Sequence, residues 1–133
     1  MRLMTSALLS LALTTSAGMA QAGLSNETDI NDGLLVLAVA DKIRRECNAI
    51  GGRLFTARSY ASQLRELATD RGYSEAQVDA YINSKLETAK MRERRNAYFA
   101  SKGASNLDPD SLCVLGRDEI ARGTQVGKLL KAR

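Results

Sequence analysis

The sequence contains no histidine and no tryptophan, and only one proline, two cysteines, four tyrosines and two phenylalanines among its 133 residues. Histidine is the commonest general base and a common metal ligand in proteins. Its absence excludes serine–histidine and cysteine–histidine catalysis and the usual zinc sites. Carboxylate or lysine chemistry is what remains for an enzyme, so the composition favours a protein that is not an enzyme.

Strong charge of one sign is also absent. The formal net charge is +4, and Arg2 is the only charged residue before Gly23. Such a mild excess of positive charge does not indicate a nucleic-acid-binding protein. The abundant Ala, Leu, Arg and Glu favour helices, and no stretch alternates apolar and polar residues for long enough to predict a sheet.

The N-terminus has the three parts of a secretory signal: a basic start at Met1-Arg2, an apolar run over residues 3–13 and the motif Ala20-Gln21-Ala22. The alternative is a membrane anchor, but a spanning helix needs about 20 apolar residues. Polar residues interrupt this stretch too early, at Thr5, Ser6, Ser10, Thr14, Thr15 and Ser16. We therefore predict that residues 1–22 are a cleaved signal and that the mature chain begins at Gly23 in a bacterial periplasm.

Residues 23–133 form a single domain in this interpretation, an all-α bundle of five or six helices closed by one disulfide. A first helix should begin near Asn31 or Asp32, either of which can cap it, and end or bend at Gly51-Gly52. A second helix is expected over about 53–70, with Gly72 as its left-handed cap.

Three further helix starts have capping signals. Ser74 with Gln77 forms a capping box. Asn83-Ser84 favours a break before the next helix, although one long helix reading through it remains an alternative. Asp108-Pro109 combines a capping carboxylate with a proline at the first helical position. Gly103 should stop the preceding helix, and Gly123 should separate this last long helix from a short final one.

The two cysteines, Cys47 and Cys113, are expected to form a structural disulfide, because paired cysteines are typical of small exported proteins. A redox pair is the alternative, but its cysteines usually lie two residues apart. A metal pair would need further ligands, and no histidine supplies them. The bridge would contribute about 4 kcal/mol to stability in the chain-entropy model.

Acidic residues do not form a recognisable catalytic or metal site. Residues 27–33 are rich in acids, but the EF-hand spacing fails and a role at the helix start is simpler. Asp118 and Glu119 are adjacent on a helix and should diverge, and Asp108 has a capping role beside Asp110. No phosphate-binding glycine motif occurs. We predict no catalytic, metal-binding or cofactor-binding residue.

The densest basic run is Lys90-Met91-Arg92-Glu93-Arg94-Arg95. One interpretation is a solvated helix face with its charge softened by neighbouring glutamates. The other is a docking surface for an acidic partner or anionic lipid, with Met91, Tyr98 and Phe99 as apolar anchors. Arg, Met and aromatic residues are enriched in interfaces. This candidate interaction surface comprises Lys90, Met91, Arg92, Arg94, Arg95 and Tyr98.

Together these motifs resemble an alphaproteobacterial family of short exported proteins that carries only a domain-of-unknown-function label. The resemblance covers essentially the whole of residues 23–133, and both cysteines stand where that family has them. It is carried by Asp32-Gly33-Leu34, Ile43-Arg44-Arg45-Glu46-Cys47, Gly72-Tyr73-Ser74, Lys90-Met91-Arg92 and residues 98–103, 112–117 and 119–127.

The family resembles proteins encoded among the genes of the proton-pumping NADH:quinone oxidoreductase, respiratory complex I. The resemblance implies a periplasmic accessory subunit, peripheral to the inner membrane and docked on the outer face of the membrane arm. Its partners would be subunits of that complex and anionic lipid headgroups, with no nucleic acid. The alternative function is a stand-alone periplasmic binding module for a small ligand or another envelope protein.

Overall fold

The computed structural model describes residues 23–133. The predicted signal, residues 1–22, lies outside the described residues. The described chain is mostly helical, as predicted, with six α-helices, a short 3₁₀ turn at Leu24–Asn26 and a two-stranded sheet. The helices are α1 (Thr28–Glu46), α2 (Leu54–Asp70), α3 (Glu75–Ile82), α4 (Lys85–Ser101), α5 (Pro109–Arg122) and α6 (Gln125–Lys128), and the strands are β1 (Ile50–Gly52) and β2 (Leu130–Ala132).

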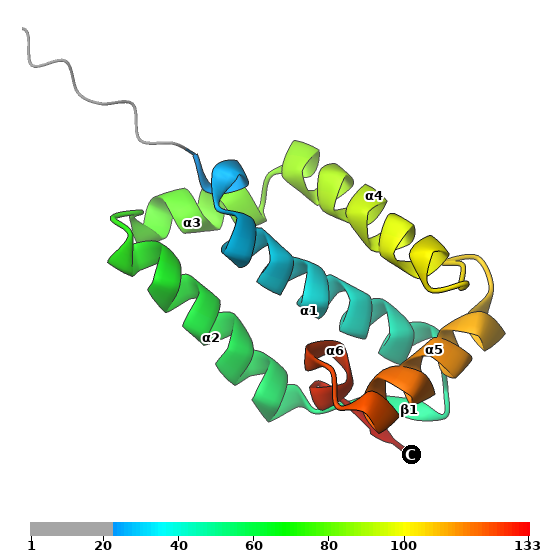
Figure 1. Cartoon of the computed structure of the whole chain (residues 1–133). Coiled ribbons are helices and arrows are strands. Elements are labelled where there is room, and N and C mark those ends of the chain that lie inside the picture. Colours follow the sequence, from blue (N-terminus) through cyan, green and yellow to red (C-terminus); the bar gives the residue numbers. More distant parts are fainter. Residues whose placement is uncertain (1–22) are drawn as a thin grey trace, which may run out of the picture.

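Helix α1 lies in the middle of the molecule, with α2 on one side and α4 on the other (Figure 1). Helix α4 runs alongside α1 in the same direction, whereas α5 and α6 lie against its C-terminal half. Among residues 23–133, none of the helices has the length and apolar character needed to cross a bilayer.

The main hydrophobic core surrounds the C-terminal half of α1. Its fully buried members come from α1, β1, α4, α5 and the C-terminal segment, which shows that distant parts of the chain converge there. The members with 0–1% exposure are Val39, Ile43, Cys47, Ile50, Phe99, Leu112, Leu129 and Leu130.

The predicted bounds of the first helix were wrong at both ends. Helix α1 begins at Thr28, and Asn31 lies buried inside its first turns instead of capping it. The Asn31 side-chain amide donates to the backbone carbonyls of Leu24 and Glu27, each at 2.8 Å. It therefore ties the preceding 3₁₀ turn to the helix, a contact that an N-cap position would not allow.

The glycine pair Gly51-Gly52 does not end a helix. Helix α1 ends at Glu46, and both glycines lie in β1, which pairs antiparallel with β2. In this register Gly51 lies opposite Lys131 and Gly52 opposite Leu130. The prediction that the chain has no sheet was thus wrong for six residues, because this pairing joins segments too distant for a local pattern to reveal.

The other predicted helix boundaries are confirmed. Ser74 and Gln77 form the complete capping box of α3. The break at Asn83-Ser84 is present, and the Ser84 hydroxyl accepts a bond from the backbone N–H of Glu87, 3.2 Å away. Gly72, Gly103 and Gly123 have the positive φ angles expected after helices.

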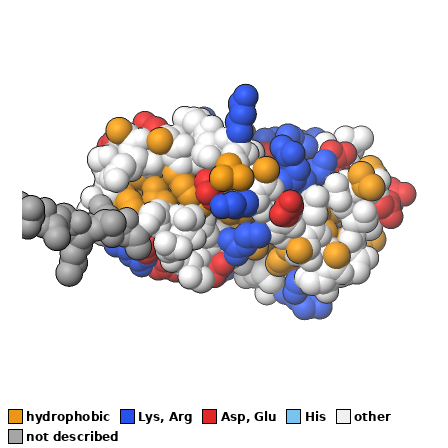
Figure 2. Space-filling model, turned by 90° about the horizontal axis from the view of Figure 1, so that it is seen from above, with side chains coloured by type: hydrophobic (Ala, Val, Ile, Leu, Met, Phe, Trp, Pro, Cys, Tyr) orange, Lys and Arg blue, Asp and Glu red, His pale blue; other side chains and the backbone are white. Residues whose placement is uncertain are grey.

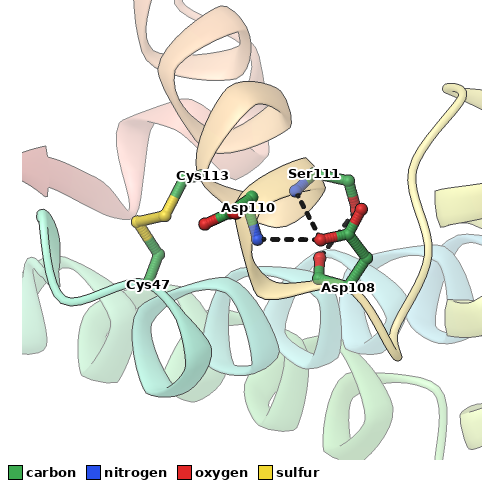
Figure 3. The surroundings of a disulfide bond; sticks show 5 residues. All are labelled: Cys47, Asp108, Asp110, Ser111 and Cys113. Carbon is green, nitrogen blue, oxygen red and sulfur yellow. Dashed lines mark hydrogen bonds between the residues drawn. A yellow bond between two sulfur atoms is a disulfide. The ribbon is translucent and has the colours of Figure 1, made fainter.

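The disulfide joins Cys47 and Cys113, as predicted, across 66 residues of sequence (Figure 3). Cys47 directly follows α1, and Cys113 lies in the first half of α5. Near it, the Asp108 carboxylate accepts bonds from the backbone N–H groups of Asp110 and Ser111. The capped start of α5 is thereby linked to the end of the central helix α1.

Candidate functional site: a basic groove between α1 and α4

A cavity of about 610 Å³ lies between α1 and α4 and is open to the protein surface. This volume is within the range of about 300–1,000 Å³ that is usual for small-molecule sites. We call this cavity the basic groove. It is lined by Leu34, Ala38, Lys42, Arg45, Tyr81, Ile82, Glu87, Thr88, Met91, Arg92, Arg95 and Asn106.

Helix α1 contributes Leu34, Ala38, Lys42 and Arg45, which are three or four residues apart and so lie on one face. The first two are apolar and the last two are basic. Helix α4 runs parallel to α1 and adds Met91, Arg92 and Arg95. The groove therefore changes along its length from an apolar part to a basic part. 

The space-filling view shows a corresponding arrangement on the face seen from above. Lys and Arg side chains gather over its middle, and a strip of hydrophobic side chains lies to their left (Figure 2). Surfaces of this kind, with cations beside exposed apolar area, are suited to an acidic partner that also has an apolar part.

The two cations from α1 already have carboxylate partners. Lys42 lies 2.7 Å from Glu46. Arg45 lies 2.8 Å from Asp41. These are one-turn pairs on the helix surface, which contribute only a few tenths of a kcal/mol and exchange readily for a stronger anionic partner.

The two arginines from α4 are less neutralised. Arg92 is exposed and has no ion pair within residues 23–133, and Arg95 donates to the side-chain oxygen of Asn96 at 2.9 Å. Burial lowers the pKa of Arg95, and the positive charges of Arg45 and Arg92 lower it further. The charges of Arg45 and Arg92 thus act on Arg95, and those of Asp41 and Glu46 partly offset them.

Lys90 and Arg94 lie on the other side of Met91 from these arginines. Lys90 lies 3.3 Å from Glu87, and Arg94 pairs with Asp32 of α1 at 2.8 Å. Together they line a smaller, neighbouring cavity of about 330 Å³, which shares Tyr81, Glu87 and Met91 with the basic groove. The predicted surface is thus divided into two parts, and only the part with Arg92 and Arg95 borders the basic groove.

Tyr98 was expected to be an apolar anchor of this surface, but it does not line the basic groove. Its ring packs against the main core, and its hydroxyl donates to the buried carboxylate of Glu119. Burial raises the pKa of Tyr98, as does its bond to Glu119. Tyr98 was included in the predicted surface because aromatic residues are enriched in interfaces. Phe99, the other aromatic anchor expected there, is fully buried in the same core.

The Glu119 carboxylate also accepts a bond from the Thr124 hydroxyl, which in turn accepts a bond from the backbone N–H of Gly127 at 3.0 Å. Glu119 is 2% exposed, and its side-chain oxygens accept bonds from the hydroxyl groups of Tyr98 and Thr124 inside the protein. This arrangement positions α6 against α5. Sequence reasoning missed it, since only the folded chain brings Tyr98 to Glu119.

The other carboxylates considered as catalytic candidates have structural partners. Asp118 pairs with Arg122 at 3.1 Å, away from the buried Glu119, and Asp108 caps α5. No group of three or more Cys, Asp or Glu side chains within residues 23–133 is placed to hold a metal ion. The arrangement that remains for function is the basic groove, which has the chemistry of an anion-binding surface.

The groove includes Lys42 and Arg45, which were not predicted as site residues. Their signal in the sequence was the cluster Lys42-Ile43-Arg44-Arg45, which lies on a helix expected to be central and was therefore interpreted through its apolar residues alone. The parallel course of α1 and α4 joins this cluster to the predicted basic run.

No curated protein and no solved structure matches the chain. A protein-family model matches residues 22–131, which include every element described above except the last residue of β2. The chain therefore belongs to DUF5333, a family of unknown function.

Proposed function

We propose that this protein is a non-catalytic accessory protein that docks on an acidic surface through the basic groove. The observation that carries the proposal is the convergence of Lys42, Arg45, Arg92 and Arg95 on one cavity beside exposed apolar side chains. Within residues 23–133, Glu87 is the only acidic residue that lines the same cavity. Such a surface attracts anionic groups and repels cationic ones.

The partner that we propose is the membrane arm of respiratory complex I, on its outer, periplasmic face. This part of the proposal rests on the resemblance of the sequence to exported proteins encoded among complex I genes, together with the export signal expected in residues 1–22. The basic groove would face subunits of the complex and the anionic lipid headgroups around them, which attract surface cations by about 1 kcal/mol each.

A non-catalytic role is supported by what the acidic side chains do. Asp108 caps a helix, Asp118 pairs with Arg122, and Glu119 accepts two bonds from buried hydroxyls. Every buried side-chain nitrogen or oxygen in the described part of the chain has a hydrogen-bond partner.

Gentle solubilisation of native membranes tests the proposal. The protein should migrate with complex I on a native gel stained for NADH dehydrogenase activity. The charge reversal Arg92→Glu should release it, whereas Arg117→Glu, on an exposed position of α5 away from the groove, should not. Migration of the wild-type protein as a separate monomer beside intact complex I would contradict the proposal.

The size of the basic groove favours a second candidate, a stand-alone periplasmic module that binds a small ligand or another envelope protein. A cavity of about 610 Å³ is large enough to enclose a metabolite-sized molecule. Native mass spectrometry of the protein isolated from its own cells should then detect bound ligand mass. Bare protein mass together with association with complex I would leave the first candidate alone.

A further inference from the structure

A second cavity, different from the one lined by Lys90 and Arg94, adjoins the basic groove. It has a volume of about 220 Å³ and lies between α1, α2 and α3. Its lining is mostly apolar and includes Leu24, Ile30, Leu64, Ala68 and Val78. Leu34, Tyr81 and Ile82 line both cavities, so the two share a wall at the apolar part of the groove.

The shared wall has exposed apolar area at its surface. Ile82, the last residue of α3, is 50% exposed although it borders both cavities. Leu34 is only partly buried. An apolar chain lying over these residues would remove this area from water, with a gain of about 25 cal/mol per Å².

The opposite part of the groove is suited to an anion. It is lined by Lys42, Arg45, Arg92 and Arg95, and Arg92 has no ion-pair partner in the described chain. Guanidinium groups bind carboxylates through paired, charge-assisted hydrogen bonds. The two parts of the groove together thus fit a molecule with one acidic end and one apolar end.

We infer that the basic groove binds one molecule of a single-chain acidic amphiphile, a long-chain carboxylic acid. The carboxylate lies among Arg45, Arg92 and Arg95, and the hydrocarbon chain lies along Leu34 and Ile82 toward the second cavity. This inference rests on the proposal that the groove is the binding surface, and it names the ligand that the groove takes.

Calorimetric titration of the purified protein tests the inference, with laurate as the probe below its micelle concentration. Laurate should bind with a stoichiometry of one. Acetate lacks the hydrocarbon chain, and dodecyltrimethylammonium has the opposite charge. Each should bind at least about tenfold more weakly than laurate, since the first loses the apolar contacts and the second loses the pairing with the arginines. Equal binding of laurate and dodecyltrimethylammonium would overturn the inference, as would no binding of laurate.

Two variants locate the site. Arg92→Gln and Ile82→Asn change exposed side chains at the basic and apolar parts, so both should fold, as circular dichroism would confirm. Each should weaken laurate binding by about tenfold or more, whereas Arg117→Gln should bind as the wild type does. Unchanged laurate binding by Arg92→Gln would overturn the inference, and so would binding to anionic phospholipid vesicles without any binding of monomeric laurate.

The inference and the proposed function can fail separately. If Ile82→Asn loses laurate but still migrates with complex I, docking does not depend on the ligand. If the wild type binds laurate but does not migrate with complex I, the accessory role fails and the ligand site remains.

Discussion

The two ends of α1 are held in place by different forces. At its C-terminal end the chain is fixed by the Cys47–Cys113 disulfide and a fully buried core. At its N-terminal end a smaller apolar cluster is supplemented by surface ion pairs, including those of Arg71 with Glu27 and Asp29. Covalent and apolar contacts resist salt and pH, whereas surface ion pairs do not. The C-terminal end is therefore a stable base, and the α3–α4 end beside the groove is more adaptable.

Among the changes that compare the two ends of α1, removal of the disulfide should have the largest effect on the free energy of unfolding. The double substitution Cys47→Ala/Cys113→Ala opens a loop of 66 residues, so the free energy of unfolding should fall by about 4 kcal/mol. Urea denaturation of the variant and the wild type measures it. A loss below about 1 kcal/mol would mean that the core alone holds the C-terminal end.

Two glycine substitutions compare the packing of the two ends. A Cβ on Gly127 would lie 1.9 Å from the Glu119 carbonyl oxygen, so Gly127→Ala must move backbone and should cost about 3 kcal/mol. A Cβ on Gly33 would lie 2.5 Å from a methyl group of the partly buried Leu64, which can rotate. Alanine also favours helix, so Gly33→Ala should change stability by less than about 1 kcal/mol. If urea denaturation showed equal losses of unfolding free energy for Gly127→Ala and Gly33→Ala, the expected difference in packing between the two ends would be contradicted.

The buried hydroxyl bonds give a third contrast. Tyr98→Phe removes a donor from the buried Glu119 carboxylate and should destabilise the protein by about 2 kcal/mol. Tyr81→Phe removes a donor from the neutral amide oxygen of Asn31 and should cost about 1 kcal/mol. The reverse order in thermal unfolding would show that the N-terminal end is the better packed one.

The smallest effect concerns pH at the N-terminal end. The hydrogen bond from Arg71 lowers the pKa of Asp29 below its ordinary value of 3.8, against a smaller opposing effect of desolvation. Because the pKa of Asp29 is lower in the folded state, its ionised carboxylate stabilises the fold. This contribution to stability is complete above about pH 4 and is lost as the pH falls through the folded-state pKa. Thermal unfolding of Asp29→Asn should therefore depend less on pH below 4 than that of the wild type. An identical pH dependence of thermal unfolding in the variant and the wild type would contradict a contribution of Asp29 to stability.

Local signals in the sequence predicted most of the helix boundaries. Ser74, Ser84 and Asp108 cap helices through bonds to residues two or three positions away, so the pattern and the structure coincide. The same applies to Gly123, whose left-handed conformation ends α5. The disulfide was predictable from cysteine number and the expected compartment.

The errors involve partners far apart in the sequence. Gly51 and Gly52 form a strand only because residues 130–132 return to pair with them, and the backbone N–H of Arg53 bonds to the carbonyl of Leu129 at 2.7 Å. The buried Glu119 bonds to Tyr98, which comes from another helix, α4. A pattern within one segment contains no information about such contacts.

For the candidate site, the sequence predicted the α4 half and missed the α1 half. Arg92 and Arg95 belonged to an evident basic run, whereas Lys42 and Arg45 became site residues only through the parallel packing of α1 and α4. Tyr98, predicted for the same surface, does not line the groove and bonds to Glu119 of α5 instead.

Hydrogen exchange with mass spectrometry, with and without laurate, tests the central claim most directly. Peptides from residues 109–133 should exchange slowly in both states, since they belong to the stable base. Peptides from residues 81–95 should exchange faster and become protected when laurate occupies the basic groove. Unchanged exchange of residues 81–95 on addition of laurate, or protection confined to residues 109–133, would contradict the claim that laurate binds in the basic groove.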